Sequence, residues 1–252
     1  MKRSDVLLLT GVILCAGLVI VFGVPGIIPY ADKTLGGLIS ETVPRLAVSV
    51  LLMIFMIKWG YADMLKPRWR ARHFLWSIPC FVVAVVNFPF SALIGGAAVI
   101  ERPDLIWLFL LSCASIALLE EIFFRAILLP FLMERLQNGR YRVILSVLIS
   151  SALFALMHLV NLFFGAGFGE TALQVGYTFL IGCMLAVTLL KTKNVWLCVI
   201  IHAVFNIGGA IVTQLGRGAF QDTVFWSLTA CAGLICAVHI LFSLIKMIKK
   251  SR

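Results

Sequence analysis

Residues 104–134 read DLIWLFLLSCASIALLEEIFFRAILLPFLME. This apolar run is longer than the roughly 20 residues that an α-helix needs to cross the hydrocarbon core of a bilayer. Three charged residues nevertheless interrupt its middle: Glu120, Glu121 and Arg125. Glu120 lies 16 residues after the acid that opens the run and 15 before the base that follows it, which at about 1.5 Å per residue is roughly 23 Å in each direction. The run therefore predicts a membrane-spanning helix with carboxylates near mid-membrane, where a charged side chain needs a partner or a function.

The whole chain shares this apolar character. Of its 252 residues, 62% are AVILMFWYC and only 13% are DEKR, and the mean hydropathy is +1.08. A soluble globular domain is close to half apolar and about a quarter charged. The composition therefore excludes a secreted disulfide scaffold, a cytosolic enzyme and a disordered tail, and it indicates a protein surrounded mostly by lipid.

Apolar runs of about 17–25 residues recur along the chain. We expect eight spans, near 6–28, 43–60, 74–98, 104–134, 143–164, 171–190, 194–215 and 223–246. The first run follows two basic residues but is long for a secretory signal, so we interpret it as a retained span. The sequence thus predicts an all-α, polytopic transmembrane bundle that forms one domain over 1–252, with its motif-bearing core at about 104–215.

The basic residues indicate how the bundle is oriented. Sixteen of the 21 Lys and Arg residues fall in the termini and loops of one side. The opposite side has only Lys33, Arg45, Arg102 and Arg217. Because cytoplasmic loops are enriched in Lys and Arg, both termini are predicted to be cytoplasmic. The net charge of +10 is then explained by anionic lipid, so we expect no nucleic-acid partner. The seven cysteines form no CxxC pair and are interpreted as packing residues.

The polar residues left inside the spans differ in their helical neighbours. Glu121 and Arg125 are i,i+4 neighbours and suit an ion pair. Glu120 is about 140° from Arg125 around an ideal helix, so it is a candidate proton acceptor. One structural bridge that joins both glutamates to the arginine is an open alternative. The remaining polar residues within the spans are His158, placed on one helical face with Phe154 and Asn161; His202, which shares a face with Asn206; and His239, interpreted as structural.

Three short motifs resemble those of a known family. Residues 120–125 (EEIFFR) resemble its EExxxR motif, residues 154–158 (FALMH) its FxxxH motif and residues 202–206 (HAVFN) its HxxxN motif. The family is the CAAX protease and bacteriocin-processing family, also called CPBP or Abi, of intramembrane proteases. The motifs occur in the family's order, and each lies within a predicted span.

The resemblance implies a polytopic helical protease that cleaves a peptide bond within or beside the membrane. It implies that Glu120 activates water, that Glu121 and Arg125 have structural or orienting roles, and that His158, His202 and Asn206 position water and stabilise the oxyanion. A metal-free, glutamate-based mechanism without a cofactor is the favoured one for the family. A zinc ion held by Glu120, His158 and His202 is the alternative, although the chain has no HExxH motif.

The expected partners are membrane lipid and a peptide or membrane-protein substrate, and the expected location is a bacterial cell membrane. We expect the active site to act at the cytoplasmic-leaflet side. Two rival functions remain open at this stage. One is a non-catalytic immunity or scaffold protein that binds a peptide on the same fold, and the other is a proton-coupled transporter, since Glu and His also relay protons in membranes.

Overall fold

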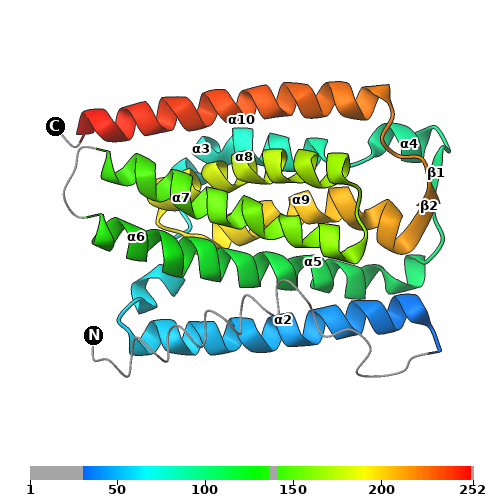
Figure 1. Cartoon of the computed structure of the whole chain (residues 1–252), viewed down its shortest axis with the longest axis horizontal. Coiled ribbons are helices and arrows are strands. Elements are labelled where there is room, and N and C mark those ends of the chain that lie inside the picture. Colours follow the sequence, from blue (N-terminus) through cyan, green and yellow to red (C-terminus); the bar gives the residue numbers. More distant parts are fainter. Residues whose placement is uncertain (1–30, 137–140, 251–252) are drawn as a thin grey trace.

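The computed structural model describes residues 31–136 and 141–250, so the expected first span at 6–28 lies outside the described residues. The described part is a bundle of helices that run side by side along one axis (Figure 1). The long helices are α2 (Lys33–Lys58), α5 (Ile106–Glu120), α7 (Arg142–Leu156), α8 (Phe168–Thr192), α9 (Val195–Leu215) and α10 (Thr223–Lys250).

Shorter elements connect these helices. They are η1 (Ala62–Leu65), α3 (Ala71–Val86), α4 (Phe90–Ile94), β1 (Ala98–Ile100), η2 (Pro103–Leu105), η3 (Glu121–Leu128), α6 (Leu129–Arg135), η4 (Met157–Phe164) and β2 (Gly216–Gly218). Because η2, α5, η3 and α6 follow one another without a break, they form a single long helix, and η4 extends α7 in the same way.

Six helical segments of the described residues are long and apolar enough to cross a bilayer. They are Lys33–Lys58, Pro103–Arg135, Arg142–Phe164, Phe168–Thr192, Val195–Leu215 and Thr223–Lys249. They correspond to six of the eight predicted spans, and the helical membrane bundle is confirmed. Large apolar side chains also cover the outside of the bundle, for example Leu234 and Leu241, which are 68% and 61% exposed. Such a surface suits lipid rather than water.

Two predicted spans have different boundaries in the structure. The span expected at 74–98 is a helix of only 16 residues that ends at Val86. Pro89 disfavours a helical conformation of the residue before it, and Gly96 has a φ of 75°, so the chain turns there instead of continuing the helix. The span expected at 43–60 begins ten residues earlier, at Lys33. The side chain of Asp32 accepts a hydrogen bond from the Leu35 amide (2.9 Å) and so caps this helix.

The two ends of the bundle differ in charge. We call the end that carries β1 and β2 the β end, and the opposite end, where α2, α6, α8 and α10 terminate, the basic end (Figure 1). Arg102 binds Asp32 and Asp104 at the β end, each at 2.8 Å. The hydrogen bond from Arg102 holds the pKa of Asp32 below its usual value.

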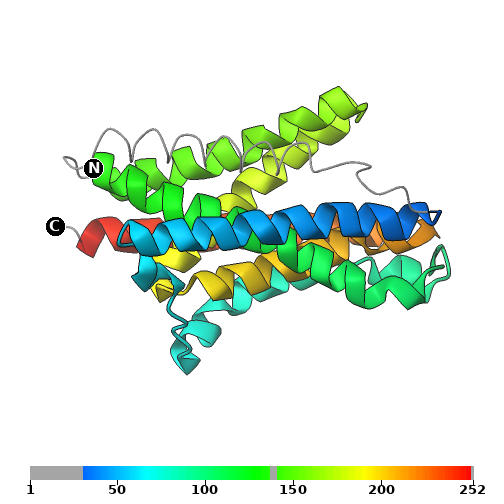
Figure 2. The same cartoon turned by 90° about the horizontal axis from the view of Figure 1, so that it is seen from below.

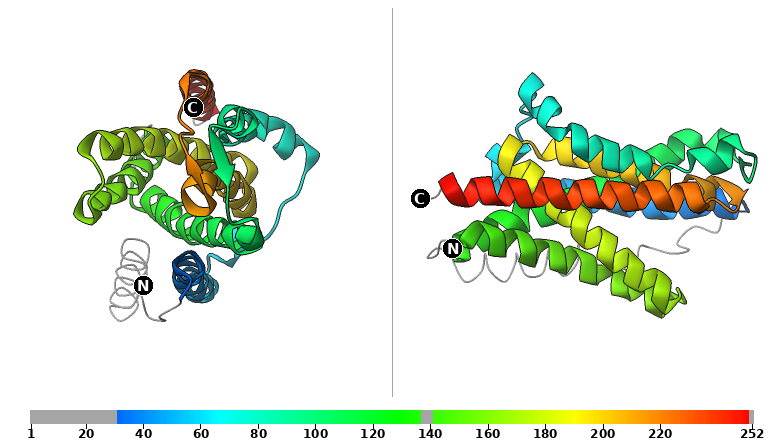
Figure 3. Two further views of the ribbon diagram at one scale, coloured as in Figure 1. Left: turned by 90° about the vertical axis from the view of Figure 1, so that its right-hand side faces the viewer. Right: turned by 90° about the horizontal axis from the view of Figure 1, so that it is seen from above.

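A two-stranded ribbon closes part of the β end (Figure 3, left). β1 and β2 are antiparallel, and the residue pairs are Ala98 with Gly218, Val99 with Arg217 and Ile100 with Gly216. A side chain at Gly216 would collide with the carbonyl oxygen of Val99, so glycine allows the close approach of the two strands. The ribbon joins the segment before α5 to the end of α9.

The interior is divided along the bundle axis. One apolar cluster lies toward the basic end and includes Leu119, Ile122, Leu185, Leu197 and Ile201, all with no exposed surface. A smaller cluster lies toward the β end, around residues of α2, α5 and α9. The hairpin of α7, η4 and α8 diverges from the other helices toward the β end, as two perpendicular views show (Figures 2 and 3).

Candidate functional site

The central feature of the site is a π-helical segment in the long helix that contains α5. Residues Glu121–Leu128 (η3) form this wider segment, directly after Glu120. π-segments within α-helices are frequent at functional sites, because they change the direction of the side chains beside them. The ideal α-helical angles used for the sequence therefore do not describe this segment. The neighbours Glu121 and Arg125 that those angles predicted are nevertheless retained.

The predicted ion pair between Glu121 and Arg125 is present. Nε of Arg125 lies 3.2 Å from Oε2 of Glu121, and the two side chains are 1% and 0% exposed. The guanidinium also lies over the ring of Phe154, at 4.5 Å from its centroid. Cation–π contacts of this kind stabilise a desolvated arginine. Arg125 therefore neutralises Glu121 in an enclosed environment.

His202 connects the two glutamates. Its Nδ1 lies 2.8 Å from Oε1 of Glu121, and its Nε2 lies 3.5 Å from Oε2 of Glu120. Because Glu121 is ion-paired and can only accept a hydrogen bond, the Nδ1–H of the imidazole is the donor. The charged groups thus follow the order Arg125, Glu121, His202, Glu120. The alternative of one bridge in which Arg125 holds both glutamates is not what the structure shows, since Glu120 faces His202.

His158 reaches the site from η4, which is a 3₁₀-helix rather than the α-helix expected. Its Nδ1 lies 3.1 Å from the carbonyl oxygen of Phe154, which can only accept, so Nδ1 carries the proton and Nε2 remains for other contacts. The ring of Phe154 lies between the imidazoles of His158 and His202, with centroid distances of 5.3 and 5.8 Å. Asn161, which the sequence placed on the same helical face as His158, donates a hydrogen bond to Gln174 of α8 (2.8 Å).

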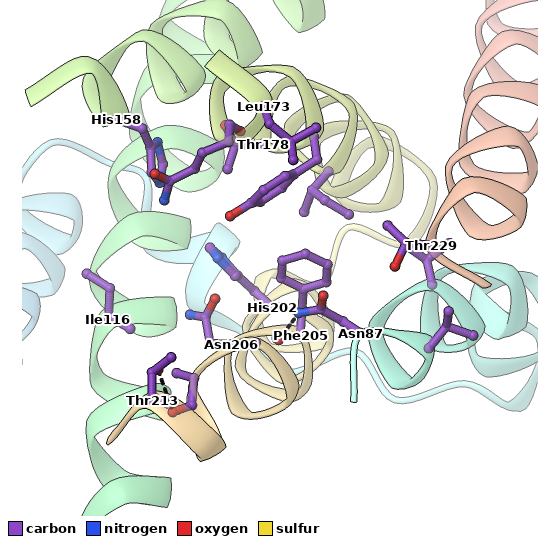
Figure 4. A pocket seen from close by; sticks show the side chains of 18 of the residues that line it. Asn87, Ile116, His158, Leu173, Thr178, His202, Phe205, Asn206, Thr213 and Thr229 are labelled. Atoms are coloured by element: carbon purple, nitrogen blue, oxygen red, sulfur yellow. Dashed lines mark hydrogen bonds between the residues drawn. The ribbon is translucent and has the colours of Figure 1, made fainter. Parts of the chain in front are cut away.

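These side chains share one cavity of about 910 Å³. Glu120, His158, His202 and Asn206 all line it. Figure 4 shows His158 on one side of the cavity and His202 and Asn206 on the other, with their side chains directed toward the space between them. The cavity thus brings together side chains from α5, η4 and α9.

The close approach of α3 to α9 supports Asn206. The side chain of Asn87, at the end of α3, donates a hydrogen bond to the carbonyl oxygen of Phe205 (2.7 Å; Figure 4). Gly208 and Gly209 make room for this contact, since a Cβ on either would lie 2.8 Å from atoms of Asn87. Asn87 was not among the residues singled out in the sequence, where it was placed within a continuous span.

The cavity also contains an ion pair that the sequence analysis placed in a loop. Nη1 of Arg45 lies 2.9 Å from Oε2 of Glu41, and both residues line the cavity from within α2. Their i,i+4 spacing and the N-cap at Asp32 are the signals that could have placed them in the helix. Pro44 lies between them inside the helix.

Two further predictions concern residues around the site. His239 does not line the cavity; it packs on Trp76 (4.5 Å between ring centroids) and lies 3.8 Å from the sulfur of Cys80, as a structural residue would. In the part of the chain that the structure describes, no three His, Cys, Asp or Glu side chains are placed to hold a metal ion.

Comparison with known families adds independent evidence. Residues 102–208 match the family model described as type II CAAX prenyl endopeptidase Rce1-like. Over these residues the chain is similar to the CAAX protease and bacteriocin-processing family. The match contains all three motifs of this family of intramembrane proteases, whereas α2, α3 and α10 lie outside it. No curated protein and no solved structure matches the chain.

Proposed function

We propose that the chain is an intramembrane endopeptidase in which Glu120 activates the attacking water. The observation that carries this proposal is the position of the Glu120 carboxylate. It lines the cavity inside the apolar bundle, while the neighbouring Glu121 is neutralised by Arg125. Peptide hydrolysis needs a base that can reach water and a donor for the oxyanion, in a site sheltered from bulk solvent.

The proposed reaction begins with proton transfer from water to Glu120. The resulting hydroxide adds to the carbonyl carbon of the substrate peptide and forms a tetrahedral oxyanion. The side-chain amide of Asn206 donates a hydrogen bond to this oxyanion, and Nε2 of His158 orients the water before it attacks. The proton on Glu120 then passes to the departing nitrogen as the C–N bond breaks.

Glu121 and Arg125 act as positioning residues in this proposal. Glu121 holds the imidazole of His202 through Nδ1, and His202 in turn holds the Glu120 carboxylate. Arg125 compensates the charge of Glu121, which lowers the cost of burying that carboxylate beside His202. The mechanism uses no metal ion.

The proposed substrate is a peptide or membrane protein in a bacterial cell membrane. Peptidomics of cells that carry the native chain or Glu120→Gln would identify it, because the products depend on the carboxylate. Glu134→Gln is the matched control, since Glu134 lies on the same long helix but hydrogen-bonds Tyr61 outside the cavity. We expect product peptides with the native chain and with Glu134→Gln, and none with Glu120→Gln. If Glu120→Gln accumulates in the membrane and gives the same products, the chain is a binding protein rather than a protease.

A further inference from the structure

The cavity lies on one side of the reacting groups. From α5 it takes Phe109, Ser112, Cys113 and Ile116 together with Glu120, all on the side of that helix that leads to the β end. From α9 it takes His202 and residues that follow it toward the β end. The lining residues of α8 likewise end at Ile181 and those of α10 at Cys236, so both helices line the cavity along the parts nearer the β end. The cavity therefore extends from Glu120 toward the β end.

The opposite side of the reacting groups is closed. Leu119, Ile122, Leu185, Leu197 and Ile201, none of which has exposed surface, belong to the apolar cluster toward the basic end. Interiors packed in this way have few voids larger than a water molecule. Within the described ranges 31–136 and 141–250, no part of this cavity is lined by η3, α6 or the part of α8 that follows Ile181. A water molecule or a peptide therefore reaches Glu120 from the β end.

Charged side chains in the open half of the cavity suit a water-filled space. Glu41 and Arg45 lie eight and twelve residues into α2, roughly 12 and 18 Å from its start at about 1.5 Å per residue. Their side chains are 39% and 15% exposed, and Nε of Arg45 has no hydrogen-bond partner in the protein. Charges at such depth are found where they pair or face a water-filled cavity. Glu170, at the start of α8, adds a third charge to the lining nearer the β end.

The basic residues show which side of the membrane the β end faces. In the described helix termini and loops, Lys and Arg gather at the basic end, for example Arg68, Arg70 and Arg72. Arg102 and Arg217, at the β end, are each paired with acids, and the bond between Arg217 and Glu101 is 2.6 Å. The positive-inside rule then assigns the basic end to the cytoplasm. The expectation of access from the cytoplasmic leaflet does not agree with this cavity.

We propose that the protease takes its substrate from the non-cytoplasmic side, as an exported peptide or as a membrane-anchored segment exposed at the outer leaflet. This inference rests on the proposed function for its substrate, whereas the access route that it requires can be tested without proteolysis. The chain would then act after translocation, so the class of process that supplies its substrate is peptide export.

Cysteine labelling in intact cells tests the route. The variants are Thr213→Cys, near the mouth of the cavity; Ser112→Cys, two helical turns from Glu120; and Lys193→Cys, exposed at the basic end. Each full-length variant is treated with a membrane-impermeant maleimide, and the labelled residue is located by peptide mass spectrometry, so the seven native cysteines do not interfere. Serine-to-cysteine replacement is close to isosteric, so Ser112→Cys preserves the fold even if Thr213→Cys does not.

We expect labelling at 213 and 112 in intact cells, and labelling at 193 at least tenfold lower until the cells are permeabilised. Labelling at 193 but not at 213 or 112 in intact cells would overturn the orientation. Absence of label at 112 in permeabilised cells would overturn the water-filled route. A chain that labels as expected but yields no products that depend on Glu120 would keep the route and reject only the proteolysis.

Discussion

Replacing Arg125 by methionine leaves Glu121 as a buried carboxylate without its cation. Both side chains are at most 1% exposed, their ion-pair distance is 3.2 Å, and the guanidinium also covers the Phe154 ring. Removing one partner of a buried pair costs about 3–5 kcal/mol. We therefore expect Arg125→Met to lower the free energy of unfolding by that amount, measured by reversible unfolding in mixed micelles of a mild detergent and dodecyl sulfate.

A double-mutant cycle separates the pair from general damage to the core. We expect the double variant Glu121→Gln/Arg125→Met to be more stable than the sum of the single variants predicts, by about 1–3 kcal/mol, because neither charge is then left alone. Arg135→Met is the control, since Arg135 is exposed on the same long helix and lies over Phe131. We expect its cost to stay below about 0.5 kcal/mol. A cost of less than 1 kcal/mol for Arg125→Met, or simple additivity in the cycle, would show that the pair is not a coupled buried unit.

Three other predictions follow from the site. His158→Ala should lower kcat about 10²-fold or more, whereas His239→Ala, outside the cavity, should leave kcat within about twofold; equal losses in product-formation assays would contradict the separation of the two histidines. A strong chelator should leave cleavage unchanged, and inhibition that added zinc reverses would require a metal step. Gly208→Ala should destabilise the bundle by about 1–3 kcal/mol in the same unfolding assay, because the new Cβ would lie 2.8 Å from the backbone of Asn87. Gly37→Ala is the control, since a Cβ there would have no atom within 4 Å, and it should be neutral or slightly stabilising.

Much of the fold could be predicted because lipid imposes strong constraints on a sequence. A chain that is 62% apolar leaves few architectures open, and the apolar runs gave the helices directly. The ion pair between Glu121 and Arg125 also followed from their spacing, since i,i+4 neighbours share a face of almost any helix.

Features that depend on packing could not be predicted in the same way. The sequence analysis used ideal α-helical angles after Glu120, whereas the structure has a π-helical segment there. Arg45 was assigned to the base-poor side of the membrane, and its ion pair with Glu41 within α2 became visible only in the structure. Sequence separation likewise gave no measure of how near His158 and His202 come to one aromatic ring.

The ribbon of β1 and β2 has a mechanical consequence. It joins the segment just before α5 to the end of α9. The helices that carry Glu120 and His202 are therefore held together at the β end. Their spacing there cannot grow unless three residue pairs separate. Any dilation that admits a bulky chain must therefore come from the opposite wall, where the hairpin of α7, η4 and α8 already splays outward and its tip carries Phe163 and Phe168, 87% and 77% exposed (Figure 2).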